Sequence, residues 1–277
     1  MTALRLELSC YASTLKNQKF SSFQTTNFLS ERTCKLISAS FRKVLIGVVA
    51  IATLIFAWLL ITLLNFVPPL FLPSPIEITK TFYSLAIEGY REIPLQNHVL
   101  YSLMRVVVAF LLACVMGIIL GLIMAMNKTT EGIFDPIIEL YRPIPPIALI
   151  PLFIIWLGIG EISKIGIIFI SIFPVIVINT ISGVRGIAQT KIWAAQSLGA
   201  KKWKMFFHIT LPGALPDIMT GMRVGIGFGW TTLVASEMIA AESGIGWMAL
   251  NARRFLRTDI IICSVIIMGV IGLLLDR

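Results

Sequence analysis

Long apolar stretches alternate with polar connections along the 277 residues of this chain. The apolar stretches cover residues 44 to 66, 99 to 126, 133 to 157, 162 to 182, 214 to 241 and 259 to 275. A helix needs about 20 apolar residues to cross the hydrocarbon core of a bilayer, and every stretch is close to that length or longer. The pattern therefore predicts an all-α, polytopic membrane protein with about six transmembrane helices.

The composition agrees with a membrane location. Hydrophobic residues make up 57% of the chain and charged residues 13%, whereas soluble domains are about 25% charged. The net charge of +9 does not require nucleic acid, because membrane orientation alone places Lys and Arg in cytoplasmic loops. The four cysteines are scattered without paired spacing, so we expect neither a metal site nor a disulfide framework.

The distribution of basic residues predicts the orientation in the membrane. Residues 1 to 43 hold seven Lys or Arg against two acids, and the connection 183 to 213 holds five against none. The excess of positive charge in cytoplasmic segments places both inside the cell. We therefore expect a cytoplasmic amino-terminal segment over residues 1–43 and a multi-pass transmembrane domain over residues 44–277.

One connection disagrees with the charge rule. Residues 242 to 258 are external in this topology, yet they hold three arginines against Glu242: Arg253, Arg254 and Arg257. These side chains are either simply solvated or form an electropositive outer vestibule that concentrates anions.

Ionisable and irregular positions within the apolar stretches mark candidates for the translocation pathway, because charges are costly in a membrane. The candidates are Glu139, Arg142, Pro145, Pro146, Arg223, Gly225 and Glu237. Glu139 and Arg142 are three residues apart and can pair, and the prolines that follow predict a kinked or unwound span. Arg223 either faces an anionic substrate or neutralises Glu139 or Asp217. Glu237 and Arg105 are expected to act as structural or gating partners, and Gly225 to allow close helix packing or a hinge.

The basic connection between the fourth and fifth stretches has its own pattern. Residues 190 to 213 contain helix-forming residues, with Gly199 near the middle and Pro212 near the end. This predicts a helix, a turn and a second short helix. Ala194, Ala195 and Leu198 share a face that a partner protein could approach closely; the alternative is an amphipathic helix lying on lipid headgroups.

The spacing of this connection resembles the EAA loop of ABC importer permeases. Residues 72 to 275 as a whole resemble permeases of the taurine, alkanesulfonate, nitrate and bicarbonate group, and most closely the taurine branch. The segments that carry the resemblance include FDPIIELYRPIPPIALIPLFIIWLGIGEISKI and LPGALPDIMTGMRVGIGFGW. The resemblance implies a type I importer permease fold and ATPase contact through Ala194, Ala195, Ser197, Leu198, Gly199, Ala200, Ile209, Leu211 and Pro212. Trp193 departs from the pattern, because many EAA loops carry Glu at that position.

The resemblance also implies a function and its partners. The chain is expected to be the permease of an ATP-driven importer in the bacterial inner membrane, for taurine or another small sulfonate, with nitrate or bicarbonate as the alternative solutes. Its expected partners are an ATPase subunit that holds ATP and Mg, a periplasmic or lipid-anchored solute-binding protein, a second copy of the permease, and membrane lipid.

The sequence lacks the motifs of common enzyme classes, and two other functions remain as alternatives. The sequence has no GxxxxGK[ST] phosphate loop and no GxSxG nucleophile motif, so we expect no enzymatic activity on this chain. The rivals are an ion-coupled secondary transporter or channel, which would use the intramembrane charges without an ATPase, and a membrane scaffold whose basic loop binds lipid or a soluble partner.

Overall fold

The computed structural model describes residues 45 to 276, and no β-strand occurs in this range. The expected amino-terminal segment, residues 1–43, lies outside the described residues. The chain divides into two units, Met1–Val67 and Pro68–Arg277. In the first unit, the helix Leu45–Leu63 carries no charged residue, and most of its large apolar side chains are exposed, as expected of a helix surrounded by lipid.

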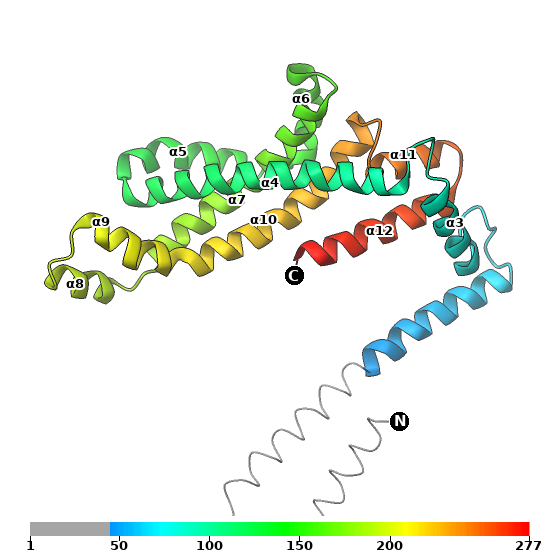
Figure 1. Ribbon diagram of the computed structural model, residues 1–277, viewed down its shortest axis with the longest axis horizontal. Helices are drawn as coiled ribbons and strands as arrows, with labels where there is room; N and C mark the ends of the chain where they lie inside the picture. The colour runs from blue at the N-terminus through cyan, green and yellow to red at the C-terminus, as the bar shows by residue number, and fades with distance from the viewer. Residues whose placement is uncertain (1–44, 277) are drawn as a thin grey trace, which may run out of the picture. The chain divides into compact units, whose positions relative to one another are not determined.

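The second unit contains the remaining helices (Figure 1). In chain order they are α3 (Pro75–Ile87), α4 (Leu95–Met126), α5 (Lys128–Tyr141), the 3-10 turn η1 (Pro146–Leu149), α6 (Ile150–Leu157), α7 (Glu161–Arg185), α8 (Gln189–Ser197), α9 (Lys202–Met205), the π-helical turn η2 (Phe206–Thr210), α10 (Leu211–Ala240), α11 (Ile245–Arg254) and α12 (Thr258–Asp276).

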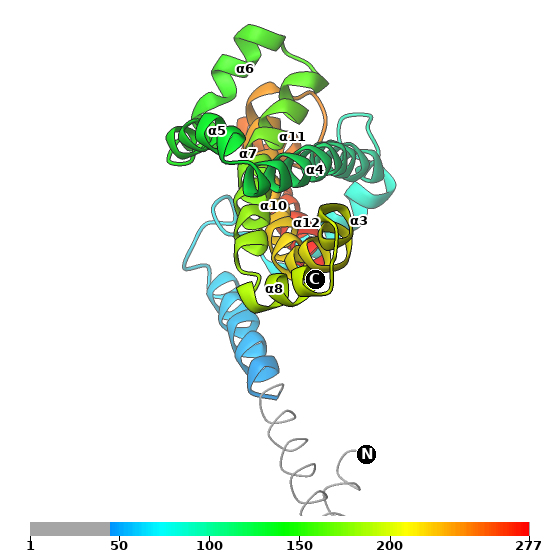
Figure 2. The same cartoon turned by 90° about the vertical axis from the view of Figure 1, so that its left-hand side faces the viewer.

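The core of this unit forms where α7 packs against both α4 and α10, and the end-on view in Figure 2 shows these three helices gathered together. Glycines allow the helices to approach closely. A Cβ atom added to Gly121 of α4 would lie 2.7 Å from Thr180 Cβ of α7, and one added to Gly221 of α10 would lie 2.6 Å from Asn179 Cβ. Only glycine fits at such distances, so α7 is held tightly on both sides.

The third apolar stretch is broken, as its prolines predicted. The helical segments Lys128–Tyr141 and Pro146–Leu157 diverge by 91°, and α6 projects away from α4 in Figure 1. Pro143 and Pro145 lie between the two segments and remove backbone donors there. The stretch expected at residues 133 to 157 is therefore two helices with a sharp bend between them and not one continuous span.

Four described helices are long and apolar enough to cross a membrane, or five if the bent pair forms one span. Helix α10 is not among them, although its 30 residues extend over about 45 Å. It is less apolar because it contains several glycines and the ionisable residues Asp217, Arg223 and Glu237. The all-α fold class is confirmed in the described range, and α10 is the expected span with the weakest apolar character.

Candidate functional site

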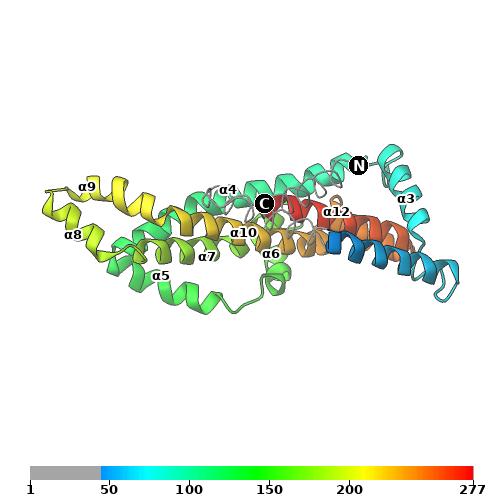
Figure 3. The same cartoon turned by 90° about the horizontal axis from the view of Figure 1, so that it is seen from below.

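A helical projection joins the end of α7 to the start of α10. It consists of α8, α9 and η2, and Figure 3 shows it extending beyond the packed core at one end of the second unit. The structure thus has the helix, turn and second short helix expected at residues 190 to 213. Since η2 continues directly into α10 and only three residues separate α7 from α8, the projection is tied closely to two core helices.

The turn after α8 is a Schellman motif centred on Gly199. The Ala200 N–H donates to the Ala195 carbonyl at 3.0 Å, and the Gly199 N–H donates to the Gln196 carbonyl at 2.9 Å. Gly199 has φ of 74°, a left-handed conformation that costs other residues about 1 to 2 kcal/mol. A Cβ atom at this position would meet open space, so the glycine is required by the backbone and not by crowding.

Large apolar side chains on this projection face away from the rest of the chain. Leu198 is 88% exposed, Trp203 73% and Trp193 59%. They lie among exposed lysines: Lys191, Lys201, Lys202 and Lys204. Such an apolar surface with a basic rim is typical of a site that another protein covers.

The residues expected to contact an ATPase do not all lie on this surface. Exposed members are Ala194, Ser197, Leu198, Gly199 and Pro212; partly buried members are Ala200, Ile209 and Leu211. Ala195 is only 8% exposed, so it does not share the open face with Leu198 that helical spacing predicted. The tight turn after α8 explains the difference, because it folds Ala200 back over the last turn of that helix.

A charge cluster in which three members are buried and Glu161 is exposed lies at the opposite ends of the core helices. Arg105 of α4 donates to Glu237 Oε1 of α10 from Nη1 at 2.6 Å, and to both carboxylate oxygens of Glu161, the first residue of α7, at 2.6 and 2.8 Å. Arg105 is 3% exposed and Glu237 is fully buried. Lys164 adds a fourth charge through a 2.8 Å bond to Glu161. The expected partnership of Glu237 and Arg105 is present, and together with Glu161 this cluster joins three helices, α4, α7 and α10.

The same cluster holds the connection between α10 and α11. Arg105 donates to the backbone carbonyl of Ser243 at 2.8 Å. The Gly246 N–H donates to Glu237 Oε2 at 2.9 Å, and the Ile245 N–H donates to Ser102 Oγ at 3.0 Å. Every oxygen of Glu237 is therefore satisfied, a condition that a buried charge requires.

The other pathway candidates lie apart from the cluster. Glu139 and Arg142 are both exposed, and the ion pairs found among residues 45 to 276 do not join them, so their expected pairing is wrong. Arg142 is the C-cap of α5 and keeps helical backbone angles, so the two positions remain about one turn apart although their side chains form no ion pair. Nearby, Pro145 is exposed and Pro146 partly buried.

Arg223 and Gly225 occupy different sides of α10. Arg223 is exposed, whereas Gly225 is buried against α7, where a Cβ atom would lie 3.0 Å from Ile172 Cγ2. Close packing is therefore the role that the structure gives to Gly225.

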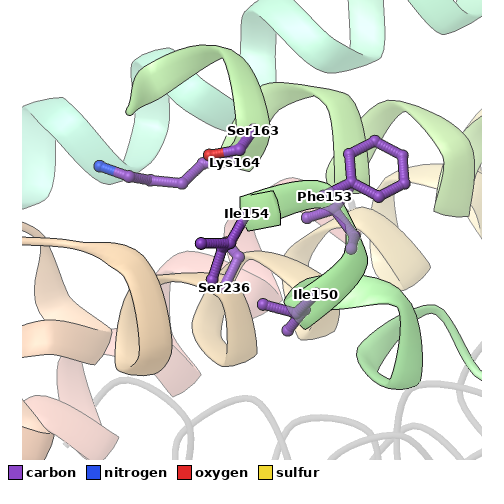
Figure 4. A pocket seen from close by; sticks show the side chains of 7 residues that line it. Ile150, Phe153, Ile154, Ser163, Lys164 and Ser236 are labelled. Atoms are coloured by element: carbon purple, nitrogen blue, oxygen red, sulfur yellow. The ribbon is translucent and has the colours of Figure 1, made fainter. Parts of the chain in front are cut away.

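A small cavity beside the charge cluster is lined by side chains of α6, α7 and α10, including Ile150, Lys164 and Ser236 (Figure 4). Its volume of about 10 Å³ has room for roughly one water molecule. It is too small to hold a transported solute.

Comparison with known proteins identifies the family. The family model described as "Binding-protein-dependent transport system inner membrane component" matches residues 117–277. The chain is also 42% identical over 236 residues to the taurine transport system permease protein TauC of Escherichia coli, covering 85% of this chain and 86% of that protein. The chain belongs to this family of inner-membrane permeases. Members are subunits of ABC importers, and the permease is therefore not itself an enzyme.

Another relative and one solved structure agree with this family assignment. The permease is 36% identical over 240 residues to the nitrate import permease protein NrtB of Synechocystis, covering 85% of this chain and 86% of that one. The structure of the MetNI methionine ABC transporter in inward-facing conformations superimposes with a TM-score of 0.55 at 19% identity, covering 66% of the permease and 93% of that chain. This likeness confirms the expected type I importer permease fold.

Sequence reasoning missed most members of the charge cluster. Glu161 precedes the apolar stretch at residues 162 to 182 and Lys164 lies within it, and neither of these residues nor Ser102 is among the predicted pathway candidates. One signal was available: His98, Ser102 and Arg105 are spaced by four and three residues, which places them on one face of a helix. Each of them binds the segment from Ser243 to Gly246 or its anchor Glu237.

Proposed function

We propose that this permease carries taurine or another small organic sulfonate into the cell, as one of two identical membrane subunits driven by separate ATPase subunits. The observation that carries the proposal is the α8 to η2 projection, with its exposed apolar surface and its direct links to α7 and α10. The solute is proposed from the relatives, because TauC is 42% identical over 85% of this chain.

The proposed orientation places the α8 to η2 projection and the chain's amino terminus in the cytoplasm. The positive charges of residues 183 to 213 support this side for the projection. The opposite ends of the core helices, with the charge cluster and α11, then face outward, where a periplasmic or lipid-anchored binding protein delivers the solute. Exposed apolar faces of the helices contact lipid or the second copy.

The core packing suggests how force reaches the pathway. When ATP closes the ATPase subunits, they move the projections, and each projection moves α7 and α10 together because glycines lock these helices to one another. The Arg105, Glu161 and Glu237 contacts join the far ends of both helices to α4. A rigid three-helix body can therefore carry a displacement from the cytoplasmic end to the outer end.

The pathway candidates are proposed in two groups. Arg223 and the bend at Pro145 and Pro146 are proposed to border the pathway, with Glu139 and Arg142 exposed beside the bend. Glu237 is proposed to hold the outer end in place, because its carboxylate is fully buried and satisfied.

Reconstitution tests this function. The permease, its ATPase and its binding protein are placed in liposomes, and ATP hydrolysis and uptake are measured with taurine, ethanesulfonate, nitrate and bicarbonate. We expect taurine or ethanesulfonate to raise both rates above the rates with no solute. Stimulation by nitrate alone would favour the alternative solute, which the 36% identity to NrtB supports. Uptake that continues without ATP and without the ATPase would instead indicate a secondary transporter or channel.

A further inference from the structure

A pocket lies at the outer corner of the permease, between the loop that precedes α4 and the turn that follows α11. It is lined by Tyr90, Arg91, Phe255, Arg257 and Ile260 and has a volume of about 310 Å³. The pocket is shallow and widely open, so a molecule bound there would keep one side exposed. Two arginines, one phenol and two apolar side chains form its wall, a combination that suits a small organic anion.

Of the two arginines that line the pocket, one has no ion-pair partner among residues 45 to 276 and can bind an anion. Arg257 donates to both carboxylate oxygens of Asp259, at 3.0 and 2.8 Å, so much of its charge is compensated. Arg91 is exposed and makes no ion pair among residues 45 to 276, although Glu92 is exposed beside it. Its guanidinium lies 4.8 Å from the centre of the Phe255 ring. The ring orients the cation without neutralising it.

Tyr90 lines the pocket and links its two sides through a hydrogen bond. Its hydroxyl donates to Asn251 Oδ1 of α11 at 2.9 Å. Burial raises the pKa of this phenol above its usual value, against the opposing effect of Arg91 and Arg257. Both guanidinium groups therefore act on the same corner of the pocket.

The backbone on both sides is strained where it presents these side chains. Tyr90 and Ile93 pair through bonds of 2.8 and 3.2 Å around Arg91 and Glu92, whose φ angles are 48° and 65°. Asn and Gly are the usual residues at such positive-φ turn positions. After α11, Leu256 has φ of 54° in the place where a Schellman turn normally has Gly. Strain of this kind is found where side chains are held for binding.

We propose that this pocket binds an oxyanion, with the sulfonate or phosphate group on Arg91 and the remaining Nη1 of Arg257 and an apolar carrier against Phe255 and Ile260. The inference rests on the proposed outward orientation of this corner. The same chemistry can come from a soluble sulfonate solute or from the phosphate of a lipid headgroup. In the first case the pocket would hold anions beside the entrance to the permease.

The test uses the permease and ATPase complex in nanodiscs, without binding protein or ATP, and radiolabelled ethanesulfonate as the probe. We expect saturable binding that uncharged dimethyl sulfone does not displace. Arg91→Asn should weaken binding at least tenfold, since Asn keeps the left-handed turn but loses the cation. Arg257→Gln should weaken it as well. Arg254→Gln is the matched control, because Arg254 is exposed and does not line the pocket, and its binding should equal the wild type.

Lipid composition distinguishes the two sources. If binding is the same in discs of zwitterionic phosphatidylcholine and of anionic phosphatidylglycerol, the site takes a soluble anion. If phosphatidylglycerol suppresses binding in the wild type, an anionic lipid headgroup competes for the same site. Absence of binding in both lipids, or equal binding in the wild type and both pocket variants, would overturn the proposal. ATP-driven uptake is measured separately with the complete importer, so loss of the site and failure of the proposed transport function give different results.

Discussion

At the residue scale, the structure shows how a membrane protein keeps charges in its core. Arg105 and Glu237 are almost completely buried, yet each has several partners: Arg105 bonds Glu161, Glu237 and Ser243, and Glu237 also accepts from Ser102 and Gly246. The desolvation cost of two buried ions is offset only by such complete pairing. Removal of Arg105 leaves the Glu237 carboxylate buried without a cation, with only the Ser102 hydroxyl and the Gly246 N–H as partners.

Arg105→Met should therefore destabilise the permease. The loss of one partner from a buried ion pair costs about 3 to 5 kcal/mol, so we expect the thermal unfolding temperature in detergent to fall by roughly 5 to 15 °C. Glu237→Gln keeps hydrogen-bonding groups at the same place and should cost less. The control is Arg254→Gln at an exposed position. Equal melting temperatures for Arg105→Met and this control would show that the cluster does not stabilise the fold.

At the element scale, the close contact between α7 and α10 links the two ends of the molecule. Gly225 and Gly229 of α10 lie against Ile172 of α7, and Gly183 of α7 lies against Ala214 and Asp217 of α10. These contacts run along most of both helices. A displacement of the α8 to η2 projection therefore cannot move α10 without also moving α7.

Gly225→Leu tests that link. A Cβ atom added at this position would lie 3.0 Å from Ile172 Cγ2, so the larger leucine side chain would force α10 away from α7. We expect uptake in proteoliposomes to fall at least tenfold, or the complex to fail to assemble. Gly227→Ala serves as the control, since a Cβ there meets no atom within 4 Å. Wild-type uptake by Gly225→Leu would contradict both the packing role and a hinge role for this glycine.

Many of the helices and turns were predictable from sequence, because the length of an apolar stretch and the positions of Pro and Gly determine structure locally. The helices in the apolar stretches, the break at the prolines after Arg142 and the turn at Gly199 were expected from residue type, whereas α3 and α11 formed in segments expected to be connections. The site was less predictable. The pairing of Arg105 with Glu237 joins residues 132 positions apart, and Arg91 meets Phe255 across a similar separation. Local pattern contains no information on which distant helices become neighbours. It marked Arg105 and Glu237 as structural or gating partners, but it could not indicate their contacts with Glu161 or with the segment from Ser243 to Gly246.

At the scale of the whole molecule, the two ends of the core helices carry different features. The projection of α8, α9 and η2 exposes Leu198 and Trp203 at one end, where the proposed function places the ATPase contact. The far end holds the charge cluster and the basic pocket. Members of the family are subunits of binding-protein-dependent transport systems, and this membership implies a separate ATPase subunit.

The most direct test of the central claim measures uptake and ATP hydrolysis together in the reconstituted importer with Gly199→Trp. Because Gly199 has φ of 74° and faces open space, tryptophan both strains the turn and adds bulk to the surface that is proposed to contact the ATPase. Gly199→Asn, which tolerates the left-handed conformation, is the control. We predict that Gly199→Trp lowers the number of solute molecules transported per ATP at least tenfold, or prevents assembly, while Gly199→Asn remains near wild type. Full coupling in Gly199→Trp would contradict the claim that this projection receives the force of the motor.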